Sequence, residues 1–200
     1  MGETKQTLRI RALHQRDSLL TSEVSLWSRL IQERVLHFPP YLLSRSVALY
    51  SPIGNEVATE EIRDHALRVS KKLFYPRLGR GENWGLAQVE SADELKPGRY
   101  GILEPQGKKF VKPADIEGMV VFVPGVAFDL RGNRLGRGKG WYDRTLKLLG
   151  EGPRLVALAY EFQIVGDLPA EGWDRRVHQI ITERRIIDCG DILPRSGWLS

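Results

Sequence analysis

The thirteen residues GNRLGRGKGWYDR, from Gly132 to Arg144, combine four glycines with four cations. Because glycine has no Cβ, main-chain N–H groups in such a stretch can approach an anion closely and form an anion-binding nest. Arg134, Arg137 and Lys139 add full positive charges. This pattern favours a loop that binds the phosphates of a nucleotide. A basic surface turn that binds nothing is the alternative, and the residues alone leave both interpretations open.

The stretch matches neither of the two common phosphate-loop patterns. A P-loop requires G-x-x-x-x-G-K-[ST]. Lys139 follows a glycine, but Gly140 and Trp141 come next and no hydroxyl residue is present there. The dinucleotide pattern G-x-G-x-x-G also fails, because Gly136, Gly138 and Gly140 are spaced as G-x-G-x-G. By spacing alone, this is an unclassified nucleotide loop.

Asp143 is the one carboxylate in the stretch, and its position allows two roles. It comes just inside the helix expected after the glycines, where a negative charge offsets the positive end of the helix dipole. It could equally supply an oxygen ligand to Mg²⁺, which would bridge to nucleotide phosphates. The pattern does not choose between these roles.

A strand and a helix must hold the glycine-rich stretch in place. GMVVFVPG, residues 118–125, is a continuous β-branched run typical of a central strand buried on both faces. WYDRTLKLLG, residues 141–150, has apolar residues at helical spacing and a glycine at its end. In open α/β sheets ligands bind beyond the carboxyl ends of the strands, which is where this loop falls.

The rest of the chain also alternates between strand-like and helix-like segments. Helices are expected over residues 5–20, 21–38 and 54–70, with Ser22 and Thr59 as N-caps of the second and third and Pro39-Pro40 ending the second. Strands are expected over residues 46–52, 71–76, 84–89, 100–105, 154–160 and 184–189. The predicted fold class is therefore α/β, a single domain with a central mixed, largely parallel sheet flanked by helices.

Composition narrows the class of protein. The 200 residues are 42% hydrophobic and carry a formal net charge of +5, which suits an anionic partner. No apolar run reaches the roughly 18 residues that a membrane span needs, and the N-terminus lacks the apolar stretch of a signal peptide. Cys189 is the single cysteine, so no internal disulfide can form. These features favour a cytoplasmic protein with no membrane partner.

The segment VPGVAFDLRGNRLGRGKGWYDR, residues 123–144, resembles the signature of 5-formyltetrahydrofolate cyclo-ligases, approximately P-G-x-x-F-D-x-x-G-x-R-L-G-x-G-x-G-Y-Y-D. KQTLR, NEVATEEI, YPR, ILEP and WDRRVHQIITE follow the family's order and spacing. The resemblance implies one cyclo-ligase domain over residues 1–200. It also implies ATP- and Mg²⁺-dependent cyclisation of 5-formyltetrahydrofolate to 5,10-methenyltetrahydrofolate through phosphorylation of the formyl oxygen, with release of ADP and phosphate.

The resemblance also implies which residues form the site. Those expected to contact ATP are Lys5, Arg9, Arg134, Leu135, Gly136, Arg137, Gly138, Lys139, Gly140, Trp141 and Tyr142. Among them, Arg137 and Lys139 are the expected catalytic cations, which neutralise the transferring phosphoryl group. Ser51, Glu56 and Tyr142 are expected to contact the folate, and Asp143 and Asp174 to associate with Mg²⁺.

Taken without the resemblance, several of these residues have ordinary structural explanations. Lys5 and Arg9 could form a solvated face, Glu56 could be a charge at a helix start, and Tyr142 could face the core. The chain also departs from the family pattern at two positions. Trp141 replaces the first tyrosine of the signature, and His178 stands where many members have aspartate.

Two other classes of function fit parts of the pattern. A small-molecule kinase could use the same loop, and a nucleic-acid-binding module would suit the positive charge. Against the second, the cations concentrate at one strand–loop–helix junction and no RNA-binding motif is present. The expected partner is 5-formyltetrahydrofolate, with or without a polyglutamate tail, bound by a monomer that binds no nucleic acid.

Overall fold

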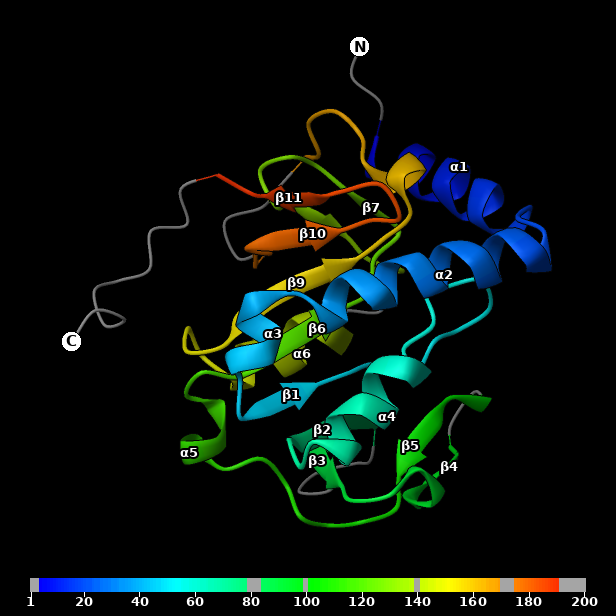
Figure 1. The fold of residues 1–200 in the computed structure, drawn as a ribbon. Helices are drawn as coiled ribbons and strands as arrows, with labels where there is room; N and C mark the ends of the chain where they lie inside the picture. Colours follow the sequence, from blue (N-terminus) through cyan, green and yellow to red (C-terminus); the bar gives the residue numbers. More distant parts are fainter. Residues whose placement is uncertain (1–3, 79–83, 99–100, 139–140, 170–174, 191–200) are drawn as a thin grey trace.

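Helices and strands alternate along the chain in the computed structural model, which describes residues 4–78, 84–98, 101–138, 141–169 and 175–190 (Figure 1). The helices are α1 (Lys5–Asp17), α2 (Thr21–Leu36), α3 (Pro39–Leu43), α4 (Glu60–Arg68), α5 (Pro113–Ile116) and α6 (Trp141–Leu148). The strands are β1 (Ser46–Ala48), β2 (Lys72–Leu78), β3 (Trp84–Val89), β4 (Leu95–Pro97), β5 (Leu103–Pro105), β6 (Val120–Val123), β7 (Ala127–Phe128), β8 (Arg134–Leu135), β9 (Arg154–Leu158), β10 (Gln179–Ile181) and β11 (Ile186–Asp188).

The central sheet has seven strands in the order β11-β10-β9-β6-β1-β2-β3. The five inner strands are parallel to one another. The edge strands β3 and β11 are each antiparallel to their neighbour. The prediction of a mixed, largely parallel sheet is therefore confirmed. Two short antiparallel pairs, β4–β5 and β7–β8, lie outside this sheet.

The order of the parallel strands locates a switch point between β1 and β6. Along the sheet the order β2-β1-β6-β9-β10 means that the chain moves one way after β1 and the other way after β6. The helices that follow these two strands, α4 and α6, accordingly cover opposite faces of the sheet (Figure 1). A crevice at the carboxyl ends of the strands is the usual ligand site in sheets of this order.

The two faces of the sheet are buried by different helices, as the apolar run of β6 predicts. Val120 and Phe122 pack in one cluster with residues of α2 and α4. Val121 and Val123 pack in a second cluster with Leu146 of α6. Successive side chains of a strand point to opposite faces, so all four β6 residues are buried and the strand is anchored on both sides.

Helix α1 packs away from the sheet, against the β7–β8 pair. Thr4 caps its start, because the Thr4 Oγ1 accepts a hydrogen bond from the Thr7 N–H at 3.2 Å. Leu8 and Ala12 share a small buried cluster with residues of β7 and β8. Because of this packing, the cations in the N-terminal part of α1 lie beside the segment that follows β8.

The three expectations about helix ends have different outcomes. Helix α2 begins at Thr21, with the Glu23 carboxylate accepting from the Leu20 N–H at 2.8 Å, so Ser22 is not the cap. Pro39 and Pro40 end α2 but also begin α3, since the first turn of a helix needs no N–H from proline. Thr59 occupies the N-cap position of α4 as expected, but its hydroxyl donates to the Tyr50 carbonyl and does not accept from the helix N–H groups. Within the described ranges no helix is both long and apolar enough to cross a bilayer.

Candidate active site

Two connections that follow neighbouring strands meet at the switch point. One follows β1 and carries Glu56, and the other follows β6 and carries the glycine-rich segment. Arg137 joins them: its Nε lies 3.3 Å from the Glu56 Oε1, and its NH2 lies 3.5 Å from the Ile53 carbonyl oxygen. The structure thus brings the predicted nucleotide loop and the predicted folate-contacting glutamate into contact across 81 residues of sequence.

The connection after β1 holds the Glu56 carboxylate in a fixed position. The Glu56 Oε2 accepts a hydrogen bond from the Ile53 N–H at 3.1 Å. The Tyr50 hydroxyl donates to the Val57 carbonyl at 2.8 Å, and the Thr59 hydroxyl donates to the Tyr50 carbonyl at 3.0 Å. These bonds close the loop on itself, so Glu56 is buried with its second oxygen directed to the cations.

A second arginine, Arg16, contacts the same carboxylate from the buried face of α1. Its NH1 lies 3.6 Å from the Glu56 Oε1 and donates to the Gly125 carbonyl at 3.3 Å. Burial lowers the pKa of the Arg16 guanidinium, and the Glu56 charge opposes that change. Arg16 is not among the site residues predicted from the sequence. Its position four residues after Ala12, on the apolar stripe, is the signal that could have identified it.

Asp129 shapes the start of the glycine-rich segment. Its Oδ1 accepts from the main-chain N–H groups of Arg131 and Asn133 at 3.0 and 2.9 Å. Its Oδ2 accepts from the Asn133 side-chain amide at 2.7 Å and from the Leu168 N–H at 3.0 Å. A buried carboxylate satisfied in this way fixes the turn between β7 and β8. Asp129 belongs to the family signature, but the sequence predicts no role for it.

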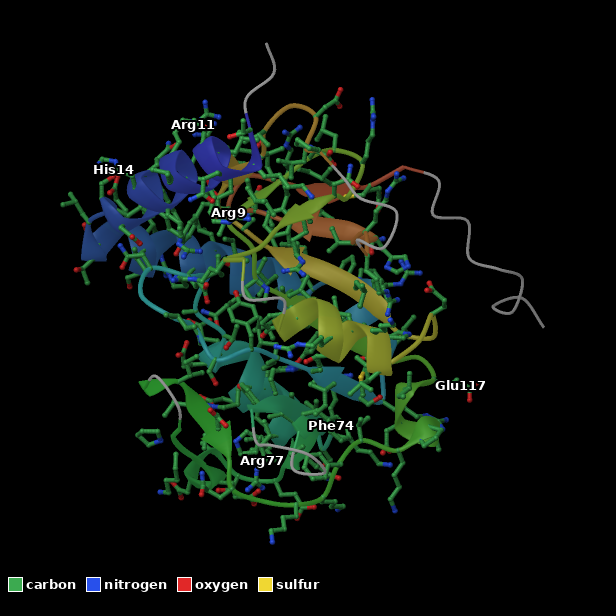
Figure 2. All side chains as sticks on the ribbon, turned by 180° about the vertical axis from the view of Figure 1, so that it is seen from behind. Arg9, Arg11, His14, Phe74, Arg77 and Glu117 are labelled. Atoms are coloured by element: carbon green, nitrogen blue, oxygen red, sulfur yellow. The ribbon has the colours of Figure 1, made fainter. Side chains whose placement is uncertain are left out.

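Helix α1 supplies a cation directly to the glycine-rich segment. The Arg9 Nε donates to the Gly136 carbonyl at 2.9 Å. Figure 2 shows Arg9 on the side of α1 that faces the body of the molecule, with Arg11 and His14 on the outer side. Gly138 has φ +88°, and a Cβ there would lie 3.7 Å from the Arg9 Cζ, so the guanidinium lies against the bare backbone.

The flanks of the segment are anchored by packing. The Arg134 guanidinium lies over the Tyr142 ring at 5.8 Å from its centroid, and its NH1 donates to the Pro124 carbonyl at 3.4 Å. Leu135 is buried in the cluster that includes Leu8, so its side chain fixes the loop to α1. Burial, and next the charge of Glu56, raise the pKa of Tyr142 well above its usual value. The Tyr142 hydroxyl is therefore neutral and able to donate.

The remaining predicted residues lie around this centre or outside the described part of the chain. Lys5 is half-buried at the first position of α1, one turn before Arg9. The Ser51 hydroxyl donates to the Leu103 carbonyl at 2.6 Å, which ties the β1 connection to β5. Arg77, which is not among the predicted site residues, lies far from Arg9, among the strands at the other end of the molecule (Figure 2), and donates to the Gln106 carbonyl at 3.0 Å.

Part of the predicted site falls on residues that the structure does not describe. These are Lys139, Gly140 and Asp174, and for Trp141 and Asp143 the structure describes the main chain at the start of α6 but not the side chain. Among the residues that are described, no three His, Cys, Asp or Glu side chains form a group that could hold a metal ion.

The donor set at the switch point suits a triphosphate. Two guanidinium groups, those of Arg134 and Arg137, belong to the glycine-rich segment, and a third, that of Arg9, contacts it from α1. The glycines of the segment leave its backbone open. Guanidinium groups bind phosphate oxygens in pairs, and glycine N–H groups can approach them closely. Glu56, an acceptor, lies beside this basic group and offers a position for the N–H groups of a second ligand.

His178, which stands where the family pattern often has aspartate, makes a structural contact. Its Nδ1 accepts a hydrogen bond from the Leu155 N–H at 3.0 Å, which requires the unprotonated nitrogen. Burial, with Arg154 next, lowers the pKa of His178 below its usual value. The imidazole is thus part of the contact between β9 and the start of β10.

Replacing His178 with asparagine is expected to flatten the pH dependence of stability. Because the pKa of His178 is lower in the folded chain, the unfolded chain binds the extra proton. The free energy of unfolding of the parent should therefore fall as pH drops below about 6.5, the usual histidine pKa. Urea titrations between pH 5 and 8 measure this. A parallel pH dependence in H178N and the parent would contradict the assignment.

Comparison with known proteins shows a family for this chain. The model of the 5-formyltetrahydrofolate cyclo-ligase family matches residues 1–183. A mouse protein named 5-formyltetrahydrofolate cyclo-ligase is 30% identical over 194 residues, which are 92% of this chain and 95% of the mouse chain.

Solved structures agree with the sequence comparison. The 5,10-methenyltetrahydrofolate synthetase of Aquifex aeolicus superimposes with a TM-score of 0.81 at 37% identity, covering 96% of this chain and 95% of the other. A synthetase of the same name from Mycoplasma pneumoniae gives a TM-score of 0.69 at 27% identity, over 90% of this chain and 99% of the other. The likeness extends over nearly the whole chain in both cases.

Proposed function

The chain belongs to the 5-formyltetrahydrofolate cyclo-ligase family, and we propose that its reaction is the ATP- and Mg²⁺-dependent closure of 5-formyltetrahydrofolate to 5,10-methenyltetrahydrofolate. ADP and phosphate are the other products. The observation that carries this proposal is the contact between Arg137 and Glu56. It supports the proposal because a cation suited to phosphate and a carboxylate suited to the N–H groups of a folate lie in contact, as a reaction between the two substrates would require.

The proposed chemistry explains why ATP is needed. A formamide oxygen is a poor leaving group, and phosphorylation makes it a good one. The formyl oxygen attacks the γ-phosphorus and ADP leaves, which gives an iminium phosphate. N10 of the folate then attacks the activated carbon, phosphate departs with the former formyl oxygen, and N10 loses its proton. No covalent nucleophile from the protein is required.

The protein's contribution is positioning and charge neutralisation. Arg9, Arg134 and Arg137 would bind the phosphate oxygens, with Lys5 and Lys139 adding charge. Glu56 would accept hydrogen bonds from the N–H groups of the reduced pterin and so hold the formyl oxygen toward the γ-phosphate. Tyr142, a neutral donor stacked beneath Arg134, would form a wall of the site.

Mg²⁺ would be held by Asp143 and Asp174 and would neutralise charge on the bridging phosphate oxygens. Asp143 belongs to the first turn of α6, directly after the glycine-rich segment, which supports its assignment. For the folate, we propose that the polyglutamate tail is optional. We also propose that the enzyme acts as a monomer and binds neither nucleic acid nor membrane.

The test is a direct assay. The protein mixed with Mg-ATP and 5-formyltetrahydrofolate should generate the near-ultraviolet absorbance of the methenyl product. ADP and phosphate should appear in equal amounts with it, and reactions without ATP or with EDTA should give none. ATP consumption with a stable phosphorylated product and no methenyl absorbance would contradict cyclisation and favour a small-molecule kinase.

A further inference from the structure

Two guanidinium groups share the Glu56 carboxylate, and they differ in their freedom to move. The Arg16 side chain is 2% exposed and the Glu56 side chain 7% exposed. The Arg137 side chain is 39% exposed. Arg16 projects from α1, whereas Arg137 stands between two glycines of the segment that follows β8. Arg16 is therefore fixed beside Glu56, whereas Arg137 is able to move away from it.

The burial of Arg16 costs free energy that packing alone does not explain. Its Nε and NH2 are buried, and no described residue accepts a hydrogen bond from either. Its NH1 makes one hydrogen bond, to the Gly125 carbonyl. A buried guanidinium with unused donors costs free energy, and an apolar side chain of similar volume often serves stability as well or better. The charge therefore calls for a reason beyond packing.

Substrate binding supplies that reason. A triphosphate carries more negative charge than a carboxylate, so the exposed Arg137 should move from Glu56 to the nucleotide when ATP binds. Without another cation, Glu56 would then be a buried carboxylate with no counter-charge, an arrangement that proteins avoid. Arg16 remains beside the Glu56 Oε1 at 3.6 Å and cannot follow Arg137 to the solvent side.

We propose that Arg16 is a positioning residue for the folate. It is the fixed counter-charge that keeps Glu56 directed at the pterin N–H groups after Arg137 has moved to the nucleotide. This inference rests on the proposed function. It assigns the two arginines successive roles on one carboxylate: Arg137 covers Glu56 in the free enzyme, and Arg16 supports it in the complex.

Glutamine and lysine at position 16 separate charge from packing. Both side chains can donate to the Gly125 carbonyl, but lysine alone keeps the positive charge. Arg16→Gln should raise the KM for 5-formyltetrahydrofolate by about 10- to 100-fold, the range for a hydrogen bond to a charged group. The KM for ATP should change less than about threefold, and Arg16→Lys should recover most of the folate affinity. Calorimetry of folate binding in the presence of Mg-ADP measures the same loss without turnover.

A double-mutant cycle with Glu56→Gln tests whether Arg16 acts through Glu56. Arg16→Gln should add little to the folate KM once Glu56 is neutral. Arg34→Gln is the matched control, because Arg34 lies near the C-terminal end of α2 and donates to the main-chain carbonyls of Leu30 and Arg184. It should leave both KM values unchanged.

Three results would overturn the proposal: equal changes in both KM values, equal losses with lysine and glutamine, or an undiminished effect in the Glu56→Gln background. If the parent enzyme itself forms no methenyl product, the proposed function fails instead. Thermal melting of each variant confirms that the comparison is made between folded proteins.

Discussion

Replacing Arg137 with alanine is expected to lower kcat by about 10²- to 10³-fold, the usual cost of removing a group that stabilises transition-state charge. In phosphoryl transfer negative charge spreads over the equatorial oxygens, and a guanidinium that reaches them acts mainly in the transition state. Among the described residues of the glycine-rich segment, Arg137 contacts the Glu56 carboxylate directly. Steady-state kinetics with each substrate varied in turn measures the effect.

The folded state of the Arg137 variant should be nearly unaffected. The Arg137 side chain is 39% exposed, so solvent screens its ion pair, and Glu56 retains Arg16 as a counter-charge. Arg131→Ala is the matched control, because Arg131 is an exposed arginine in the turn between β7 and β8 that pairs with Asp167 at 3.3 Å. A kcat within about threefold of the parent for Arg137→Ala would remove Arg137 from the catalytic step, since a group that stabilises transition-state charge costs far more.

The sequence was most informative where local signals were strong. The β-branched run of β6 identifies a strand buried on both faces, and the glycine spacing before α6 identifies an open backbone. Both are properties of consecutive residues, so they can be read without knowing the fold. The position of the loop at a strand's carboxyl end then predicts a ligand site.

Some of the short elements could not be predicted in this way. β7 and β8 have two residues each, and β10 has three. A periodic pattern needs a longer run than this to be visible. β10 forms because Ile180 and Ile181 are buried beside β9 in the sheet, which is a property of the tertiary structure and not of the segment itself.

The contacts of the site depend on strand order in the same way. Glu56 and Arg137 meet because β1 and β6 are adjacent and parallel, and nothing local to either residue encodes that pairing. The sequence therefore indicated the residue types of the site but not that Arg137 covers Glu56. Arg16 is missing from the predicted site because an arginine on a surface helix is expected on the solvated face. Its spacing from Leu8 and Ala12 is the one local signal, and the tertiary packing of α1 is what buries it.

The backbone geometry of the signature segment has its own measurable consequence. Gly132 has φ +82°, in the left-handed region that favours glycine. Its N–H donates to the Asp129 carbonyl at 3.0 Å, and its carbonyl accepts from the Val177 N–H at 2.9 Å. A Cβ at this position would collide with the Val177 carbonyl oxygen and lie 3.0 Å from the Cys189 Cβ. The Val177 carbonyl is main chain, so it cannot move aside as the end of a flexible side chain can.

Gly132→Ala is therefore expected to lower the free energy of unfolding by about 3 kcal/mol or more, from the left-handed conformation and the overpacking together. Gly150→Ala separates the two contributions, because Gly150 also has a positive φ, +61°, but no atom lies within 4 Å of the position that an alanine methyl group would take. The free energy of unfolding of that variant should fall by only about 1 kcal/mol. Urea unfolding of both variants measures the two free energies of unfolding. Equal decreases would mean that the contact with Val177 and Cys189 adds no destabilisation.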